Sequence, residues 1–310
     1  MARLKVSKFV RALDLEVLFG AGVEEFEVST SDVNRPGLAL SGFFDYFASD
    51  RIQIFGKHEM TYLMNALDDD QRYDAMDKLL ACPIPCLIIS RSMEPPQGLL
   101  QLAVKYNRLV FRSKVVTNKL MNMVTSYIGV ALAPRLTTHG VLMDVYGVGL
   151  MITGDSGMGK SETALELLRR GHRLVADDLI EVCRIGGDQL IGSAPENIRH
   201  FMEIRGIGII NIRQMYGIGS VMIQKSIDMV AQLEVWDKNK EYDRLGLQED
   251  KIQMLEVPLP KLIVPVIPGR NLAIILEVAA RNQRLKNMGY NSAVELHRMI
   301  NEHMDGMGDL

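Results

Sequence analysis

Residues 150–171 read LMITGDSGMGKSETALELLRRG, and this stretch decides the fold of the second half of the chain. Apolar residues dominate 141–153, which predicts a strand. Apolar residues then recur at helical spacing over 162–170, which predicts a helix that ends at Gly171. A strand, a glycine-rich turn and a helix in succession predict an α/β fold.

The turn between that strand and that helix, GDSGMGKS, fits the phosphate-loop pattern G-x-x-x-x-G-K-[ST]. Its glycines let the backbone bring successive N–H groups onto phosphate oxygens, and the helix that follows adds the positive end of its dipole. Lys160 supplies a cation for the β- and γ-phosphates, and the Ser161 hydroxyl can ligate Mg²⁺. The predicted nucleotide-binding residues are Gly154, Asp155, Ser156, Gly157, Met158, Gly159, Lys160 and Ser161.

The composition of the chain excludes several classes of protein. Its 310 residues are 47% hydrophobic and 24% charged, a globular mixture, and the net charge of −3 is spread along the chain. No basic patch indicates nucleic-acid binding, and no apolar run reaches the ~20 residues that cross a membrane. The N-terminus lacks a signal-peptide core, and three cysteines form neither a disulfide framework nor a zinc motif. We expect a soluble cytoplasmic protein.

Helical and strand-like patterns alternate in the first part of the chain, which predicts a small α/β domain. Ala133 and Pro134 end the last of these helices, so we expect an N-terminal domain over 1–132 and a second domain over 133–310. The predicted strands are 26–29, 51–55, 86–90 and 109–112, and the predicted helices are 58–80 (interrupted at the acidic run 68–70), 99–106 and 117–132.

Two carboxylates, Asp177 and Asp178, follow a predicted strand over 172–176. Open α/β sheets bind ligands at the carboxyl ends of their strands, so both side chains belong near the phosphate loop. One carboxylate can hold Mg²⁺ directly or through water, and the other can accept a proton from an incoming hydroxyl. The alternative is a pair of turn aspartates that cap the next element.

Two further candidates depend on chain geometry that the sequence leaves open. His139 precedes the strand that leads into the loop, so a parallel arrangement keeps it far from the phosphates and a hairpin brings it back. Arg244 lies in the polar stretch 237–250, where an exposed surface charge and an arginine that closes on a phosphoryl group are both consistent with the pattern.

Two more segments combine glycine with charge in apolar surroundings. Glu203 and Arg205 lie within 202–216, and a Pro-Gly-Arg-Asn turn over 268–271 precedes a predicted helix and could form a second anion cradle. The candidate residues of that second segment are Val264, Pro265, Val266, Ile267, Pro268, Gly269 and Arg270.

Together these motifs resemble the HPr kinase/phosphorylase family of bacterial carbon catabolite repression. The resemblance spans the whole chain and is strongest from His139 to about Gly289. It rests on His139-Gly140, GDSGMGKSETALELLRRGHRLVADD over 154–178, EIRGIGIINI over 203–212 and PVIPGRN over 265–271, in the family's order and spacing.

The resemblance implies a two-domain enzyme, a protein serine kinase and phosphorylase. The N-terminal domain would be similar to one found in Mur ligases, and the kinase domain to the nucleotide-binding core of phosphoenolpyruvate carboxykinase. Such proteins form homohexamers and use Mg²⁺ with ATP or pyrophosphate to phosphorylate a serine of HPr, a carrier of the sugar phosphotransferase system. They remove that phosphate with inorganic phosphate and release pyrophosphate, and fructose 1,6-bisphosphate favours the kinase direction in other members.

The resemblance also implies site roles by position. Asp178 matches the family's acid/base, with Asp177 beside it, and Lys160 matches the phosphate-loop lysine. One position departs from the pattern, because members commonly carry a basic residue where this chain has Ile267. The remaining matches are His139 and Arg244 to active-site residues, and Ser161 and Glu203 to magnesium ligands.

Two other readings of the chemistry stay open. One is a small-molecule kinase on a carboxykinase-like core. The other is a nucleotide-gated regulatory protein that binds ATP and hydrolyses it slowly. Asp178, together with the segments 202–211 and 264–271, favours transfer to a protein over a plain switch.

Overall fold

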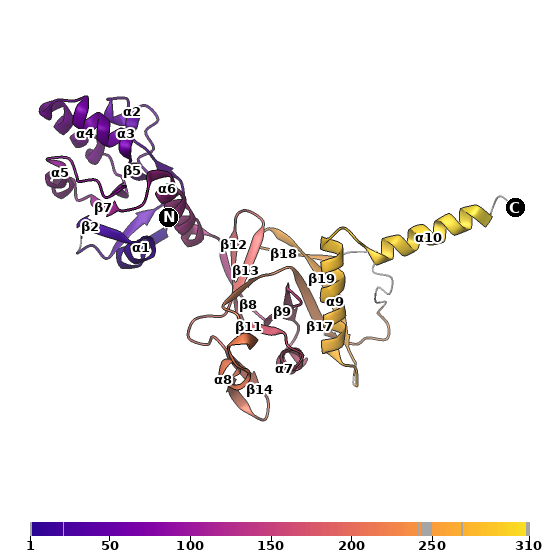
Figure 1. Cartoon of the computed structure of the whole chain (residues 1–310). Helices are drawn as coiled ribbons and strands as arrows, with labels where there is room; N and C mark the ends of the chain where they lie inside the picture. Colours follow the sequence, from indigo (N-terminus) through magenta and orange to yellow (C-terminus); the bar gives the residue numbers. More distant parts are fainter. Residues whose placement is uncertain (1, 21, 241, 243–249, 268, 308–310) are drawn as a thin grey trace. The chain divides into compact units, whose positions relative to one another are not determined.

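The chain is described by a computed structural model that covers residues 2–20, 22–240, 242, 250–267 and 269–307. It divides into two compact units, Met1–Ala133 and Pro134–Leu310 (Figure 1). No helix within the described ranges combines the length and the apolar composition that a membrane crossing needs.

A mainly parallel sheet forms the centre of the N-terminal unit, with strand order β2-β7-β6-β5-β4. The strands β4 to β7 run parallel, and β2 pairs antiparallel with β7. Every residue of β6 is buried, because helices cover both faces of the sheet. The strands of the unit are β1 (Ala2–Lys5), β2 (Leu15–Phe19), β3 (Glu25–Val28), β4 (Val33–Asn34), β5 (Ile52–Phe55), β6 (Cys86–Ile89) and β7 (Leu109–Ser113).

The helices of this unit divide between the two faces of the sheet. Along β5, Ile52 and Ile54 pack with α1 and α6 on one face, whereas Phe55 packs with α2 to α5 on the other. The predicted helix 58–80 is two helices, and the Asp68 carboxylate caps the second by accepting a hydrogen bond from the Gln71 amide (2.8 Å). The helices are α1 (Val6–Leu13), α2 (Gly37–Leu40), α3 (Lys57–Asn65), α4 (Asp69–Ala81), α5 (Leu99–Tyr106) and α6 (Thr117–Leu132).

A six-stranded sheet organises the C-terminal unit, in the order β11-β9-β10-β17-β19-β18. The strands β10, β17 and β19 run parallel, and β9 pairs antiparallel with both β10 and β11. It follows that β10, β11, β17 and β19 all end at the same edge. The strands are β9 (Val141–Val145), β10 (Val148–Thr153), β11 (Arg173–Ala176), β17 (Met229–Val235), β18 (Asp250–Met254) and β19 (Val257–Val266).

The single strand predicted over 141–153 is wrong, because a tight turn at Tyr146 and Gly147 divides it into the hairpin β9–β10. Both turn residues have a positive φ, 52° and 86°, as a two-residue hairpin turn with the right twist requires. Tyrosine is not a usual residue for this conformation, so the apolar run gave no sign of the turn.

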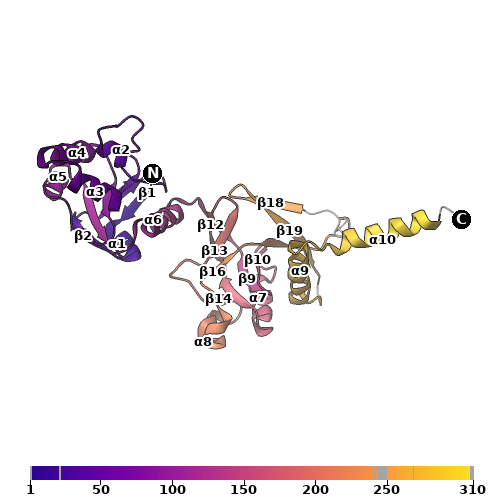
Figure 2. The ribbon, with the colours of Figure 1, turned by 45° about the horizontal axis from the view of Figure 1, so that its top comes forward.

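Helices and a second sheet cover the two faces of the six-stranded sheet. α7 (Lys160–Arg169) and α9 (Leu272–Asn287) pack on one face, as Figure 2 shows for α7 and α9 beside β9 and β10. The four-stranded sheet β16-β13-β12-β8 packs on the other face. The remaining elements are β8 (Arg135–His139), β12 (Leu179–Ile185), β13 (Gln189–Ser193), the hairpin β14 (Phe201–Ile204) and β15 (Gly208–Asn211), α8 (Ile212–Tyr216), the 3₁₀ helix Ile218–Ser220, β16 (Gln224–Ser226) and α10 (Ser292–Met307).

We predict that Gly149→Ala destabilises the C-terminal unit by about 2 kcal/mol or more. A Cβ at Gly149 would lie 1.6 Å from the carbonyl oxygen of Ser226, so the backbone has to move. That movement would also strain the two hydrogen bonds that join Gly149 to Asp228. The measurement is the free energy of unfolding in urea. Gly219→Ala, which adds a Cβ in open space, is the matched control and should change it by less than about 0.5 kcal/mol; equal effects would contradict the prediction.

Candidate functional site

The phosphate loop lies between β10 and α7, at the edge where the parallel strands end. Its glycines Gly154, Gly157 and Gly159 have φ values of 140°, 89° and 80°, which side-chain-bearing residues rarely adopt. A Cβ at Gly154 would also lie 2.6 Å from the carbonyl oxygen of Leu233 in the neighbouring strand. The Lys160 ammonium donates hydrogen bonds to the carbonyls of Gly154 (2.8 Å) and Asp155 (2.9 Å), which keeps its charge inside the loop.

Asp177 is the buried carboxylate of the site, with only 6% of its surface exposed. It follows β11, accepts a hydrogen bond from the Ser161 hydroxyl (3.0 Å), and accepts another from the backbone amide of Glu203 (3.2 Å). Burial raises the pKa of Asp177 to about 6, because desolvation outweighs these hydrogen bonds. One carboxylate therefore joins the phosphate loop to β14.

Asp178, the next residue, points the other way and into solvent, with 78% of its side chain exposed. Its φ is 66°, a left-handed conformation that Asp and Asn tolerate better than most residues, and its carbonyl accepts a hydrogen bond from the Gly140 amide (3.1 Å). The strand β8 pairs antiparallel with β12, which sets His139 opposite Leu179. The His139 Nδ1 consequently lies 3.6 Å from an Asp178 carboxylate oxygen.

The position of His139 resolves the choice that the sequence left open. The hairpin β9–β10 does not bring it back; instead β8 crosses to the second sheet and pairs with the strand that follows Asp178. The pairing partner lies some forty residues further along the chain, so no local pattern could identify it.

Arg205 places a guanidinium against the phosphate loop. Its Nη2 donates a hydrogen bond to the Ser156 hydroxyl (3.1 Å), and its Nη1 lies 3.2 Å from where a Cβ on Gly157 would stand. Glu203 contributes its backbone amide to Asp177, and the residue itself is exposed. The β14–β15 hairpin thus supplies both an arginine and a backbone donor to the site.

The last predicted segment lies at the same edge, because β19 runs parallel to β17 and β10. Val264 is buried near the end of β19, and the Arg270 amide donates a hydrogen bond to the Ile267 carbonyl (3.1 Å) in the turn that follows. Arg244 and Pro268, which were also predicted, lie outside the described residues.

Trp236 is a residue at this edge that the sequence reasoning gave no role. It directly follows β17, whose end lies beside the ends of β10 and β19, and it is 48% exposed. The apolar run over β17 could have indicated this position, because it predicts a strand. The residue that follows a parallel strand beside the loop lies at the edge where ligands bind. It is the single tryptophan of the chain, so its fluorescence can report on this edge.

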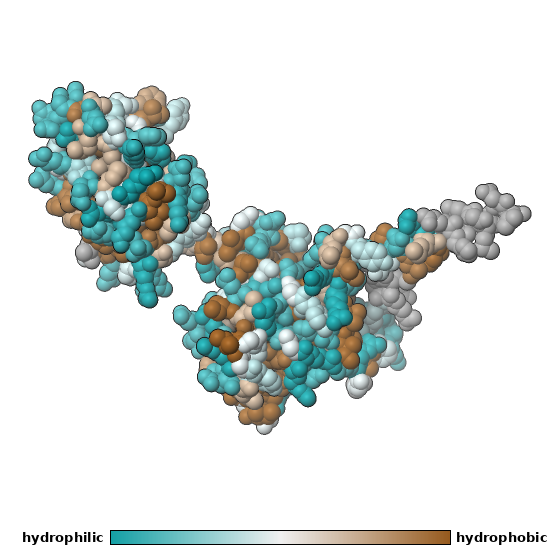
Figure 3. Space-filling view, viewed as in Figure 1, coloured by the Kyte–Doolittle hydropathy of each residue, from teal (hydrophilic) through white to brown (hydrophobic). Residues whose placement is uncertain are grey.

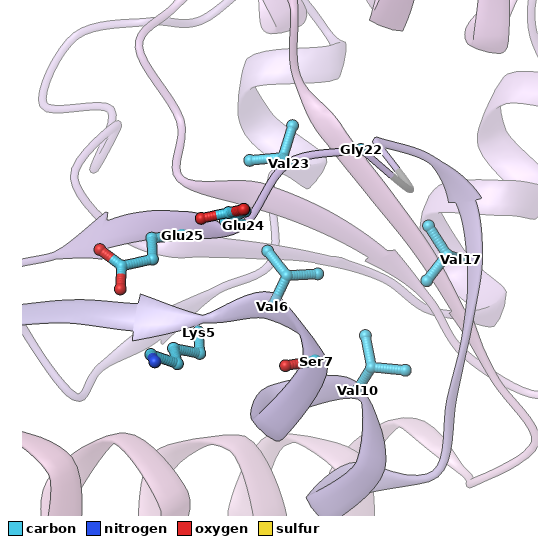
Figure 4. A pocket seen from close by; sticks show the side chains of 9 residues that line it. All are labelled: Lys5, Val6, Ser7, Val10, Val17, Gly22, Val23, Glu24 and Glu25. Carbon is cyan, nitrogen blue, oxygen red and sulfur yellow. The ribbon is translucent and has the colours of Figure 1, made fainter.

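The N-terminal unit has a pocket of its own, of about 540 Å³, between α1, β2 and the start of β3. Figure 4 shows four valines around it, with Lys5, Glu24 and Glu25 at its rim. None of the predicted site residues lines this pocket, so the candidate chemistry belongs to the C-terminal unit.

Comparisons with known proteins cover both units. The family model described as HPr Serine kinase N terminus matches residues 4–128, and that of the HPr Serine kinase C-terminal domain matches residues 130–300. The chain is 51% identical over 300 residues to an HPr kinase/phosphorylase of Caldanaerobacter subterraneus, covering 97% of this chain and 98% of the relative. It is 44% identical over 310 residues to that of Geobacillus kaustophilus, with 100% and 99% covered. The solved Hpr(Ser) kinase/phosphatase from Coxiella burnetii is 36% identical, covers 52% of this chain and 98% of its own, and gives a TM-score of 0.48.

We predict that Asp177→Asn stabilises the protein at pH 7 when divalent metal is removed, by up to about 3 kcal/mol. With its pKa raised from 3.8 to about 6, Asp177 holds a proton that the unfolded chain has lost between pH 4 and 6. Native stability should therefore fall as the pH rises through this window, and the variant should lack that fall.

The measurement is the free energy of unfolding in urea at several pH values with a chelator present. Asp188→Asn, which neutralises an exposed carboxylate in the turn after β12, is the matched control. A difference between Asp177→Asn and the native chain that stays constant from pH 4 to pH 7 would contradict the prediction.

Proposed function

The chain belongs to the HPr kinase/phosphorylase family, and on that premise we propose that it phosphorylates a serine of HPr with ATP or pyrophosphate and removes that phosphate with inorganic phosphate, releasing pyrophosphate. The observation that carries this proposal is the exposed pair of Asp178 and His139 at the edge that also holds the phosphate loop. Proton transfer to or from a serine hydroxyl is assisted by an accessible general acid or base beside the transferring phosphate, and a carboxylate can take this role.

In this proposal the loop 154–161 binds the phosphates of the nucleotide. Its backbone amides and the start of α7 offer donors and a positive dipole end to the phosphate oxygens. The Lys160 ammonium leaves its two carbonyl partners for the β- and γ-phosphates, and the Arg205 guanidinium adds a second cation beside Ser156.

Ser161 and Asp177 fit a magnesium ion. A hydroxyl and a carboxylate oxygen 3.0 Å apart are the hard oxygen ligands that Mg²⁺ prefers, and Glu203 is the residue of β14 whose backbone amide contacts Asp177. Within the described part of the chain, no three His, Cys, Asp or Glu side chains are grouped to hold a metal, so phosphates and water would complete the ligand set. When bound, the metal supplies positive charge to the transferring phosphoryl group.

Asp178 carries the proton in both directions. When the serine oxygen bonds to the γ-phosphorus and the bond to the β-phosphate breaks, the Asp178 carboxylate takes the hydroxyl proton. In phosphorolysis a phosphate oxygen attacks the phosphoserine, and protonated Asp178 returns that proton to the leaving serine oxygen. His139, 3.6 Å away, positions the carboxylate and offers a partner to it in either state.

The rest of the proposal concerns the edge segments and partners. We propose that Arg244 and the segment 264–270 contact the transferring phosphoryl group. We also propose that Ile267, in that segment, influences the phosphorolysis reaction. A homohexamer is supported by the exposed apolar side chains of the β14–β15 hairpin, where Ile207 in the turn and Ile209 in β15 are 72% and 75% exposed. Figure 3 shows hydrophobic surface in the region of α8 and β14. We also propose a cytoplasmic location, with fructose 1,6-bisphosphate and inorganic phosphate as effectors.

The proposed function is tested by incubating the purified chain with HPr, Mg²⁺ and ATP labelled in the γ-phosphate, then adding excess inorganic phosphate. We expect label on one serine of HPr and then its recovery as pyrophosphate. Label in metabolites when a cell extract replaces HPr would support a small-molecule kinase. Label only in free phosphate would support a nucleotide-gated ATPase, and either result without labelled HPr would contradict the proposal.

We predict that Asp178→Asn slows phosphorylation and phosphorolysis together, each by roughly 10²–10⁴-fold, because one group carries the proton in both directions. Asparagine keeps the shape and tolerates the φ of 66°, so packing cannot explain a large loss. The measurement is both rates on one preparation, with nucleotide affinity followed by Trp236 fluorescence. Affinity should stay within a few-fold, whereas Lys160→Ala should lose it. Loss of one direction alone would show that a second residue does part of the proton transfer.

A further inference from the structure

Three basic residues meet at the base of the β14–β15 hairpin, at the end away from Arg205. Arg199 and His200 directly precede β14, and Phe201 pairs with Asn211 across the hairpin. The Ile212 amide donates a hydrogen bond to the His200 carbonyl (2.9 Å), which brings the start of α8 and its Arg213 beside them.

Two polar atoms of this cluster are buried without a hydrogen-bond partner: the Arg199 Nε and the His200 Nδ1. Buried polar groups in folded proteins are nearly always paired, so an unpaired guanidinium nitrogen and an unpaired imidazole nitrogen in two consecutive residues need an explanation. Among the residues that the structure describes, no ion pair or side-chain hydrogen bond joins Arg199, His200 or Arg213 to a carboxylate.

The electrostatics of the cluster agree with this geometry. Burial lowers the pKa of His200, and the charges of Arg213 and Arg199 lower it further. Two guanidinium groups therefore lie close enough to repel a proton on the imidazole. Cations held together without a counter-charge reduce stability, and an anion between them removes that cost.

We propose that Arg199, His200 and Arg213 bind a phosphate group, free or as part of a larger phosphate ester, at a site separate from the phosphate loop. Guanidinium groups match phosphate oxygens with paired N–H donors, and a neutral imidazole adds one more. The four residues of β14 separate this cluster from Arg205, roughly 13 Å along an extended strand.

The position of this site connects it to the phosphate loop through one strand. The backbone amide of Glu203 binds Asp177, and Arg205 binds Ser156, both from the same hairpin. A bound anion at the hairpin's base joins Arg199 and His200 to α8 and so fixes the strand that carries those two contacts. Phosphate binding at this site does not require phosphoryl transfer, so its test is independent of the proposed function.

The test is equilibrium dialysis of the full-length chain with radiolabelled inorganic phosphate, with Mg²⁺ and a saturating non-hydrolysable ATP analogue filling the phosphate loop. We expect about one phosphate bound per chain. Arg213→Gln, an exposed position that should fold normally, should weaken this binding at least about tenfold, and Arg199→Gln with Arg213→Gln should abolish it. Arg169→Gln, which removes one charge from an exposed arginine of α7, is the matched control and should bind as the native chain does.

A second readout separates binding from folding. Phosphate should raise the melting temperature of the analogue-blocked native chain more than that of Arg213→Gln, whereas without phosphate the variant should melt no lower than the native chain. Competition with a sugar bisphosphate identifies the source: displacement at a lower concentration than free phosphate supports a phosphate ester, and displacement at a higher one supports free phosphate. No phosphate bound to the blocked native chain, or equal affinity in Arg213→Gln, would overturn the proposal.

Discussion

The antiparallel pairing of β9 with both β10 and β11 is the constraint on which the site depends. Because β10 and β11 each oppose β9, they run in the same direction and end at one edge. The phosphate loop follows one of them and the two aspartates follow the other. A site that the sequence spreads over 154–178 is thereby gathered at a single edge, and the parallel strands β17 and β19 bring their own ends to it.

The two adjacent carboxylates that follow β11 have different surroundings, and the left-handed backbone of Asp178 (φ 66°) departs from the strand conformation between them. Asp177 points inward and is buried between Ser161 and β14, so its pKa is raised to about 6. Asp178 points outward beside His139 and is exposed to solvent. In the proposed function the buried carboxylate of Asp177 holds the metal ion, and the exposed carboxylate of Asp178 transfers the proton. The hairpin β14–β15 contacts both the buried carboxylate and the phosphate loop, through the Glu203 amide and the Arg205 guanidinium.

Much of this could be predicted from local patterns. The phosphate-loop pattern located the turn between β10 and α7, the α/β alternation indicated the fold class, and the apolar spacing in 117–132 predicted the helix α6. What failed or stayed open depends on contacts that no local pattern encodes. The turn at Tyr146 was hidden in an apolar run, and the approach of His139 to Asp178 needs the pairing of β8 with β12. The basic cluster at Arg199 likewise appears only when the hairpin folds.

The most direct test of the divided carboxylates is a crystal structure of the chain with Mn²⁺ and a non-hydrolysable ATP analogue, with the metal located by its anomalous scattering. We expect a metal peak at ligand distance from Ser161, bound to Asp177 directly or through one water. We expect the Asp178 carboxylate outside the ligand set and facing the γ-phosphate. A metal bound by Asp178, or a γ-phosphate out of reach of it, would contradict the account.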